Sequence, residues 1–88
     1  MLTHSQQRAD ERYGIINFVA KRVLKDILNG KSIQIEENYD KYSRIFVVLY
    51  NNKFIRVVTD YQLRFVKTVL PLKDTDYEHI NNLIKLIA

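Results

Sequence analysis

The fold is decided by residues 44–59, which read RIFVVLYNNKFIRVVT. Residues 44–50 are almost all β-branched or aromatic, a composition typical of a strand that is covered on both faces. Asn51-Asn52 follows, and asparagine tolerates positive φ better than most residues. The stretch therefore predicts two antiparallel strands, 44–50 and 53–59, joined by a tight hairpin turn.

Two further strands are predicted on either side of this hairpin. Residues 32–36 alternate apolar and polar side chains, which is the pattern of a half-buried strand. Asp60-Tyr61-Gln62 predicts a second reversal before a last strand over residues 63–70. Pro71 ends that strand because it has no N–H to donate to a neighbour. Together these segments predict a four-stranded antiparallel meander.

Two helices are predicted before the sheet. Thr3 or Ser5 caps a first helix that ends near Tyr13, and Gly14 can adopt the left-handed conformation that closes a helix. Residues 17–29 carry apolar side chains at helical spacing, with an asparagine in the capping position and Asn-Gly as the stop signal. We expect the apolar stripe of this second helix to pack on the sheet.

A third helix is predicted after the sheet. Thr75 and Glu78 have the spacing of a capping box, and an apolar stripe continues from there to the end of the sequence. The fold class is therefore α+β: two N-terminal helices, a four-stranded antiparallel sheet and a C-terminal helix. With no linker-like segment, residues 1–88 are expected to form a single domain.

The composition excludes several functional classes. The 88 residues carry a net charge of +4 and no cysteine, which rules out disulfides, thiolate metal sites and cysteine nucleophiles. Only two histidines are present, so we expect neither a metal site nor a cofactor. The longest apolar run, residues 45–50, falls far short of the roughly 20 residues of a membrane-spanning helix. The polar N-terminal segment does not resemble a signal peptide, and we expect a soluble cytoplasmic protein with no membrane partner.

His4, Arg8 and Arg12 form the most informative pattern in the sequence. Their spacing places all three on one face of the first helix. Arginine donates two parallel hydrogen bonds to phosphate, and histidine exchanges a proton near neutral pH. The pattern favours a site for a phosphate-bearing substrate. The alternative is that Asp10 and Glu11 hold the arginines in solvated ion pairs.

The sheet carries a second basic element. Residues 53–70 contain four cations against the single Asp60, and the rings of Phe54, Tyr61 and Phe65 lie between them. Cations neutralise phosphates, and aromatic rings stack on unpaired bases. The residues predicted to bind RNA are Lys53, Arg64, Lys67 and Tyr61. For Lys53 and Lys67 the alternative is a role as edge charges that prevent aggregation of the sheet.

The helix motif His4-x-x-x-Arg8-x-x-x-Arg12-Tyr-Gly-Ile, followed by an amphipathic helix and an apolar antiparallel sheet, resembles the barnase–EndoU–colicin–RelE superfamily of small ribonucleases. The likeness covers roughly residues 3–70 and is nearest to single-domain phage and toxin members. It implies metal-independent RNA cleavage that yields a 2′,3′-cyclic phosphate and a free 5′-hydroxyl. The target would be tRNA or mRNA, and a cognate antitoxin is an implied partner.

The resemblance also implies a role for each matching residue. His4 would transfer the proton, and the guanidinium groups of Arg8 and Arg12 would neutralise the phosphate, with Arg56 as a further cation. Thr68 would hydrogen-bond the phosphate or the substrate. A second acid or base is missing from this region, and the groups that would fill this role are a lysine or one of Tyr13, Tyr42 and Tyr61.

A second hypothesis is a non-enzymatic interaction module of a phage or mobile element. Such a module would bind RNA or a host protein through the basic sheet or the apolar C-terminal helix. The apolar strand 45–50 also leaves a homodimer open. The arrangement of four residues separates the two hypotheses: convergence of His4, Arg8, Arg56 and Thr68 on one concave patch favours catalysis, and their separation favours the module.

Overall fold

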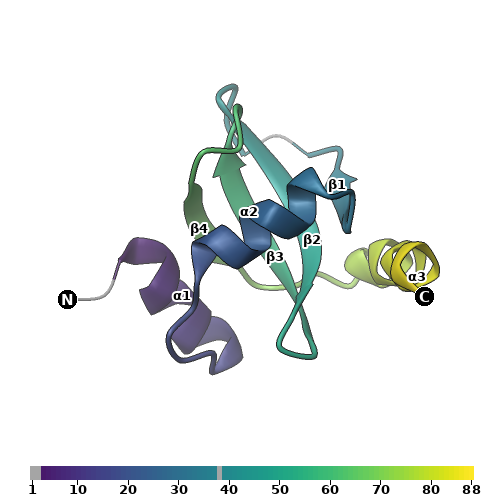
Figure 1. The fold of residues 1–88 in the computed structure, drawn as a ribbon, viewed down its shortest axis with the longest axis horizontal. Helices are drawn as coiled ribbons and strands as arrows, with labels where there is room; N and C mark the ends of the chain where they lie inside the picture. Colours follow the sequence, from purple (N-terminus) through teal and green to yellow (C-terminus); the bar gives the residue numbers. More distant parts are fainter. Residues whose placement is uncertain (1–2, 38) are drawn as a thin grey trace.

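The computed structural model describes residues 3–37 and 39–88, which form three helices and four strands arranged around one sheet. The fold is α+β, as predicted. The sheet separates α1 from α3, and α2 crosses in front of it (Figure 1). In chain order, the elements are α1 (His4–Tyr13), α2 (Ala20–Leu28), β1 (Ser32–Ile35), β2 (Ser43–Tyr50), β3 (Lys53–Asp60), β4 (Val66–Leu70) and α3 (Asp76–Ile87).

The sheet is an antiparallel meander in the order β1-β2-β3-β4, which confirms the predicted topology. Asn51 and Asn52 connect β2 to β3 with φ angles of 48° and 63°. Two successive left-handed residues make a turn whose twist matches that of the strands. The turn pairs Tyr50 with Lys53, and the ladder then runs uninterrupted to the pair of Ser43 and Asp60.

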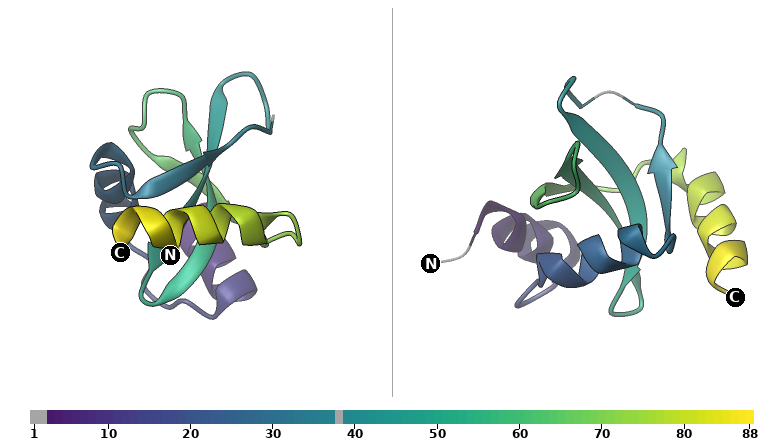
Figure 2. Two further views of the ribbon diagram at one scale, coloured as in Figure 1. Left: turned by 90° about the vertical axis from the view of Figure 1, so that its right-hand side faces the viewer. Right: turned by 45° about the horizontal axis from the view of Figure 1, so that its top comes forward.

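The two faces of the sheet bury separate apolar cores. One face packs against α1 and α2, and there Phe46 and Val57 contact a cluster that includes Phe18. The other face packs against α3, where Ile45 lies in a cluster with Leu83. Figure 2 shows α3 on one side of the sheet and α1 on the other. Both faces of β2 are buried, as its composition predicts.

The ends of the first two helices follow different rules. Thr3 caps α1: its hydroxyl accepts from the N–H of Gln6 at 3.2 Å, and the Gln6 side chain accepts from the N–H of Thr3 at 3.0 Å. Gly14 closes the helix with φ 66°, as predicted. The predicted start of the second helix at Asn17 is wrong, because Asn17 adopts a left-handed φ of 58° and the helix begins at Ala20.

Two other predicted boundaries are also corrected. The capping box at Thr75 does not form, since Thr75 itself has helical backbone angles and its side chain caps nothing. The Asp76 carboxylate instead accepts the N–H of Lys73 at 2.8 Å at the start of the helix. The last strand begins at Val66 and not at residue 63, because Leu63 lies in the preceding turn with φ 59°.

Candidate functional site

The guanidinium groups of Arg8 and Arg12 on α1 are bound by other groups of the protein. Arg8 donates to the Glu11 carboxylate at 2.6 Å, and this hydrogen bond holds the pKa of Glu11 below its usual value. Arg12 Nη1 donates to the main-chain carbonyl of Val69 at 2.6 Å and so ties α1 to β4. His4 is exposed at the start of the helix. The alternative of a solvated ion pair therefore describes Arg8.

Arg56 is buried on the sheet face that packs against α3, away from His4 and Arg8 on α1. Its guanidinium donates to both carboxylate oxygens of Asp76 at 3.0 Å and to Glu37 at 2.8 Å. The Arg56 and Asp76 side chains are 1% and 0% exposed. These contacts make Arg56 the anchor of the N-terminus of α3 rather than a free cation.

The pKa values of the two carboxyl groups reflect these contacts. Hydrogen bonds from Arg56 and then Lys73 lower the pKa of Glu37 to about 2. Burial by itself raises the pKa of Asp76, but the hydrogen bonds from Arg56, the Lys73 N–H and His79 outweigh it, and the pKa lies below its usual value. Both groups are therefore ionised at neutral pH and neutralise Arg56.

Thr68 lies on the same face as Arg56, since it pairs with Val58 one step along the face, and it is buried. Tyr13 is inserted at the end of the β3–β4 ladder, where its hydroxyl donates to the Leu70 carbonyl at 2.6 Å and accepts the N–H of Arg56 at 3.3 Å. Burial raises the pKa of Tyr13. Neither the Thr68 hydroxyl nor the Tyr13 hydroxyl is placed to reach a substrate together with His4 and the other basic residues of α1.

The predicted catalytic patch is therefore not formed. His4 and Arg8 project from α1 on one side of the sheet, whereas Arg56 and Thr68 are buried on the other. The sequence could establish that Arg56 shares a face with Phe54 and Val58, but not which face the helices cover. The sequence therefore left their convergence open, and the structure places His4 and Arg8 apart from Arg56 and Thr68.

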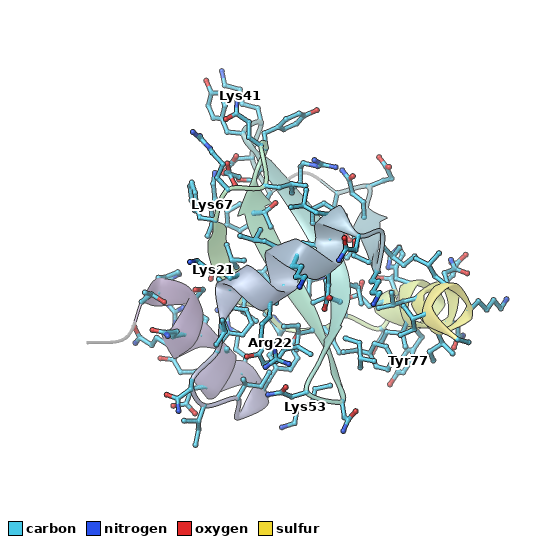
Figure 3. The ribbon with its side chains drawn as sticks, viewed as in Figure 1. Lys21, Arg22, Lys41, Lys53, Lys67 and Tyr77 are labelled. Atoms are coloured by element: carbon cyan, nitrogen blue, oxygen red, sulfur yellow. The ribbon has the colours of Figure 1, made fainter. Side chains whose placement is uncertain are left out.

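The structure does bring together three of the four predicted RNA-binding residues. Tyr61, Arg64 and Lys67 line one cavity of about 370 Å³ at the end of the sheet where β2 begins and β3 ends. We call this cavity the aromatic cleft; its full lining is Tyr42, Asp60, Tyr61, Gln62, Arg64, Phe65 and Lys67. Lys53 lies at the opposite end, beside the β2–β3 turn (Figure 3), and donates to the Tyr13 carbonyl at 2.8 Å.

Three exposed rings give the aromatic cleft its character. Tyr42, Tyr61 and Phe65 are 65%, 66% and 49% exposed, although each ring is large enough to stabilise a core. Lys41 and Arg44 lie over two of them: the Lys41 amine is 5.0 Å from the Tyr42 ring centroid, and the Arg44 guanidinium is 5.7 Å from that of Tyr61. Such cation–π contacts hold positive charge beside the rings.

Asp60 organises the loop that carries most of the aromatic cleft. Its carboxylate accepts the main-chain N–H groups of Arg64 and Phe65 at 2.6 and 3.0 Å, and Arg64 Nε at 3.1 Å. Burial raises the pKa of Asp60, but these hydrogen bonds outweigh it, so the pKa falls below its usual value. The Arg64 side chain is still 70% exposed and can donate to a ligand from its outer nitrogens.

A β-bulge positions Lys67. The consecutive residues Val58 and Thr59 pair with Thr68 and Val66, which leaves Lys67 as the extra residue on β4. A regular strand would place Val66 and Thr68 on the same face, but the bulge turns Val66 to the opposite face from Thr68. The Lys67 amine donates to Ser43 Oγ at 2.7 Å and lies 3.9 Å from Asp40, which directs it toward the start of β2.

Neither Tyr42 nor Arg44 was among the residues predicted to bind RNA. A signal for both was present in the hairpin turn, because pairing Tyr50 with Lys53 fixes the register as far as Ser43 and Asp60. The residues around Ser43 must then lie beside those around Asp60, which brings Tyr42 next to Tyr61. The position of Phe65 depends on the loop and could not be read in the same way.

Comparison with known proteins finds no family model that matches the sequence, and no curated protein or solved structure matches it either. The resemblance to the ribonuclease superfamily stays a prediction. No helix in the described part of the chain is long and apolar enough to cross a membrane. Within residues 3–37 and 39–88, no group of three or more acidic or histidine side chains is placed to hold a metal ion.

Proposed function

We propose that this protein is a non-enzymatic binding module for single-stranded RNA and that the aromatic cleft is its binding surface. One observation carries the proposal: a single cavity is lined by the exposed ring of Tyr42, just before β2, and by the exposed rings and cations of residues 61–67. Bases of an unpaired strand would stack on Tyr42, Tyr61 and Phe65. Its phosphates would meet Arg64 and Lys67.

The proposal specifies an unpaired strand because stacking needs free base faces. A duplex buries those faces between neighbouring base pairs, so the rings of the cleft would gain nothing from it. Binding without cleavage is favoured because His4, the predicted proton-transfer residue, lies on the opposite side of the sheet from the buried Arg56 and Thr68. In the aromatic cleft itself, no lining residue is a histidine.

Fluorescence anisotropy with labelled oligouridylate tests the proposal. Tyr61→Ala should weaken binding by about 5- to 100-fold, because one base stack contributes about 1–3 kcal/mol. Tyr77→Ala is the matched control: Tyr77 is 70% exposed, but it lies on α3, across the molecule from Lys67 (Figure 3). It should leave affinity unchanged.

Arg64→Ala tests the electrostatic part. The slope of log affinity against log salt should fall by about 0.7, the value for one phosphate contact on a single strand. Lys85→Ala, an exposed cation of α3, should leave the slope unchanged. Equal binding by duplex RNA, or equal loss in the Tyr61 and Tyr77 variants, would contradict the proposal; single-stranded DNA of the same sequence reports whether the ribose hydroxyl contributes.

A further inference from the structure

Two other cavities adjoin the aromatic cleft, and each shares one of its aromatic residues. A cavity of about 350 Å³ shares Phe65 and lies between the N-terminal ends of α1 and α2 and the start of β4. We call it the α2 cavity. A further cavity of about 350 Å³ shares Tyr61 and lies beside the start of β2 and the end of β1. A bound strand longer than the aromatic cleft can continue along the surface into either of these two cavities.

Charge distinguishes the two exits. The cavity beyond Tyr61 is lined by Glu36 and Arg44, whose charges offset one another, and by Glu37, which is ion-paired with Arg56 and Lys73. The α2 cavity is lined by Lys21, and no carboxylate lines it among the residues that the structure describes. The α2 cavity therefore presents an uncompensated positive charge that attracts phosphate, whereas the charges of the first cavity balance.

The cations themselves form a path toward the α2 cavity. In Figure 3, Lys41, Lys67 and Lys21 follow one another along the same side of the molecule, although they belong to the β1–β2 connection, β4 and α2. Lys67 lines the aromatic cleft and Lys21 the α2 cavity, with Phe65 between them. Lys21 is exposed and has no carboxylate partner within the described residues.

We propose that a single RNA strand bound in the aromatic cleft continues over Phe65 into the α2 cavity, where Lys21 binds a further phosphate of the same strand. This inference rests on the proposed function and adds the direction and the length of the bound strand. Phe65 then contacts a base at the junction of two subsites. No surplus of positive charge draws the strand to the opposite side, where Glu36 offsets Arg44.

A length series of oligouridylates from about two to eight nucleotides, which spans the lower range of single-strand sites, tests the inference. For the unmodified protein, affinity should rise with length until the α2 cavity is filled and then level off. Lys21→Ala should leave the shortest oligomers unaffected, weaken the longer ones, and lower their salt slope by about 0.7. Lys25→Ala is the matched control, since Lys25 is an exposed lysine one turn further along α2 that does not line the cavity.

The outcomes separate the two proposals. If no oligomer binds at any length, the proposed function fails and the inference falls with it. If short oligomers bind and depend on Tyr61, but Lys21→Ala equals Lys25→Ala at every length, the proposed function stands and the extension is overturned. Glu36→Gln gives an independent check: the inferred path predicts unchanged affinity for long oligomers, and a gain that only long oligomers show would place the strand beside Glu36, on the other side.

Discussion

The anchor of α3 on the sheet gives the sharpest test of how this fold is held together. Asp76 is fully buried and accepts two hydrogen bonds from Arg56, one from the Lys73 N–H and one shared with the His79 ring. Asp76→Ala leaves a buried guanidinium that cannot lose its charge and that keeps only the partly exposed Glu37 as an ionic partner. Removing one partner of such a pair costs about 3–5 kcal/mol.

That loss is large compared with the whole stability of the chain. At about 0.05–0.15 kcal/mol per residue, 88 residues give a free energy of unfolding of about 4–13 kcal/mol. Arg56→Met should cost less than Asp76→Ala, because the remaining carboxylate keeps the Lys73 N–H and His79 as partners and can also take up a proton. The double variant Arg56→Met/Asp76→Leu should be more stable than the sum of the single changes predicts.

Urea unfolding followed by circular dichroism measures these changes; tyrosine fluorescence is a second probe, since the protein has six tyrosines and no tryptophan. With a slope of about 1–1.5 kcal/mol per molar urea, Asp76→Ala should lower the midpoint by about 2–5 M. Glu78→Ala, an exposed acidic residue of the same helix turn, should change stability by less than about 0.5 kcal/mol. Equal effects of Asp76→Ala and Glu78→Ala would refute the anchor.

Three further predictions concern pH, the cleft loop and catalysis. The folded pKa of Glu37 is about 2, so its contribution to stability is present above the unfolded pKa near 4.5 and is lost as pH falls toward 2. The urea midpoint should therefore drop between these pH values, and it should drop less steeply in Glu37→Gln. A Glu37→Gln profile identical to that of the unmodified protein would contradict this role of Glu37. Asp60→Ala removes the acceptor of two loop N–H groups and should lower RNA affinity at least as much as Tyr61→Ala; unchanged anisotropy would show that the loop holds its shape without the carboxylate. RNA incubated with the protein in the absence of divalent metal should stay intact on a denaturing gel, and cleavage that His4→Ala abolishes would instead support the ribonuclease hypothesis.

The sheet and its hairpin could be predicted because their signals are local. Asn51-Asn52 fixes the turn, and the apolar run before it fixes a strand buried on both faces. Asn17 shows the limit of such signals, since asparagine favours both a helix cap and a left-handed residue, and here it is left-handed. The packing of the surrounding residues decides whether Asn17 caps a helix or becomes left-handed, and this packing cannot be predicted from a short segment.

The site was predicted least well where it depends on which face a side chain takes. Arg56 and Lys67 were both assigned to a basic sheet surface, yet only Lys67 lines the aromatic cleft. Arg56 finds Asp76 twenty residues further along the chain and becomes part of the core. Lys67 takes its position from a β-bulge that no residue type in this segment predicts. Composition identified a basic, aromatic region, whereas the burial of Arg56 beside Asp76 shows that this cation serves the fold.

The backbone of the cleft loop gives a separate reason to regard this surface as functional. Leu63 adopts a left-handed φ of 59°, a conformation that costs a non-glycine residue about 1–2 kcal/mol. Glycine would remove this strain, but a leucine side chain packs against the core beneath α1 and α2 and so fixes the loop from below, while Asp60 fixes it from within. A loop held at both points presents Tyr61, Arg64 and Phe65 in one arrangement before any ligand arrives. For the RNA binding proposed above, less conformational entropy would then be lost on binding, and this gain would offset the strain.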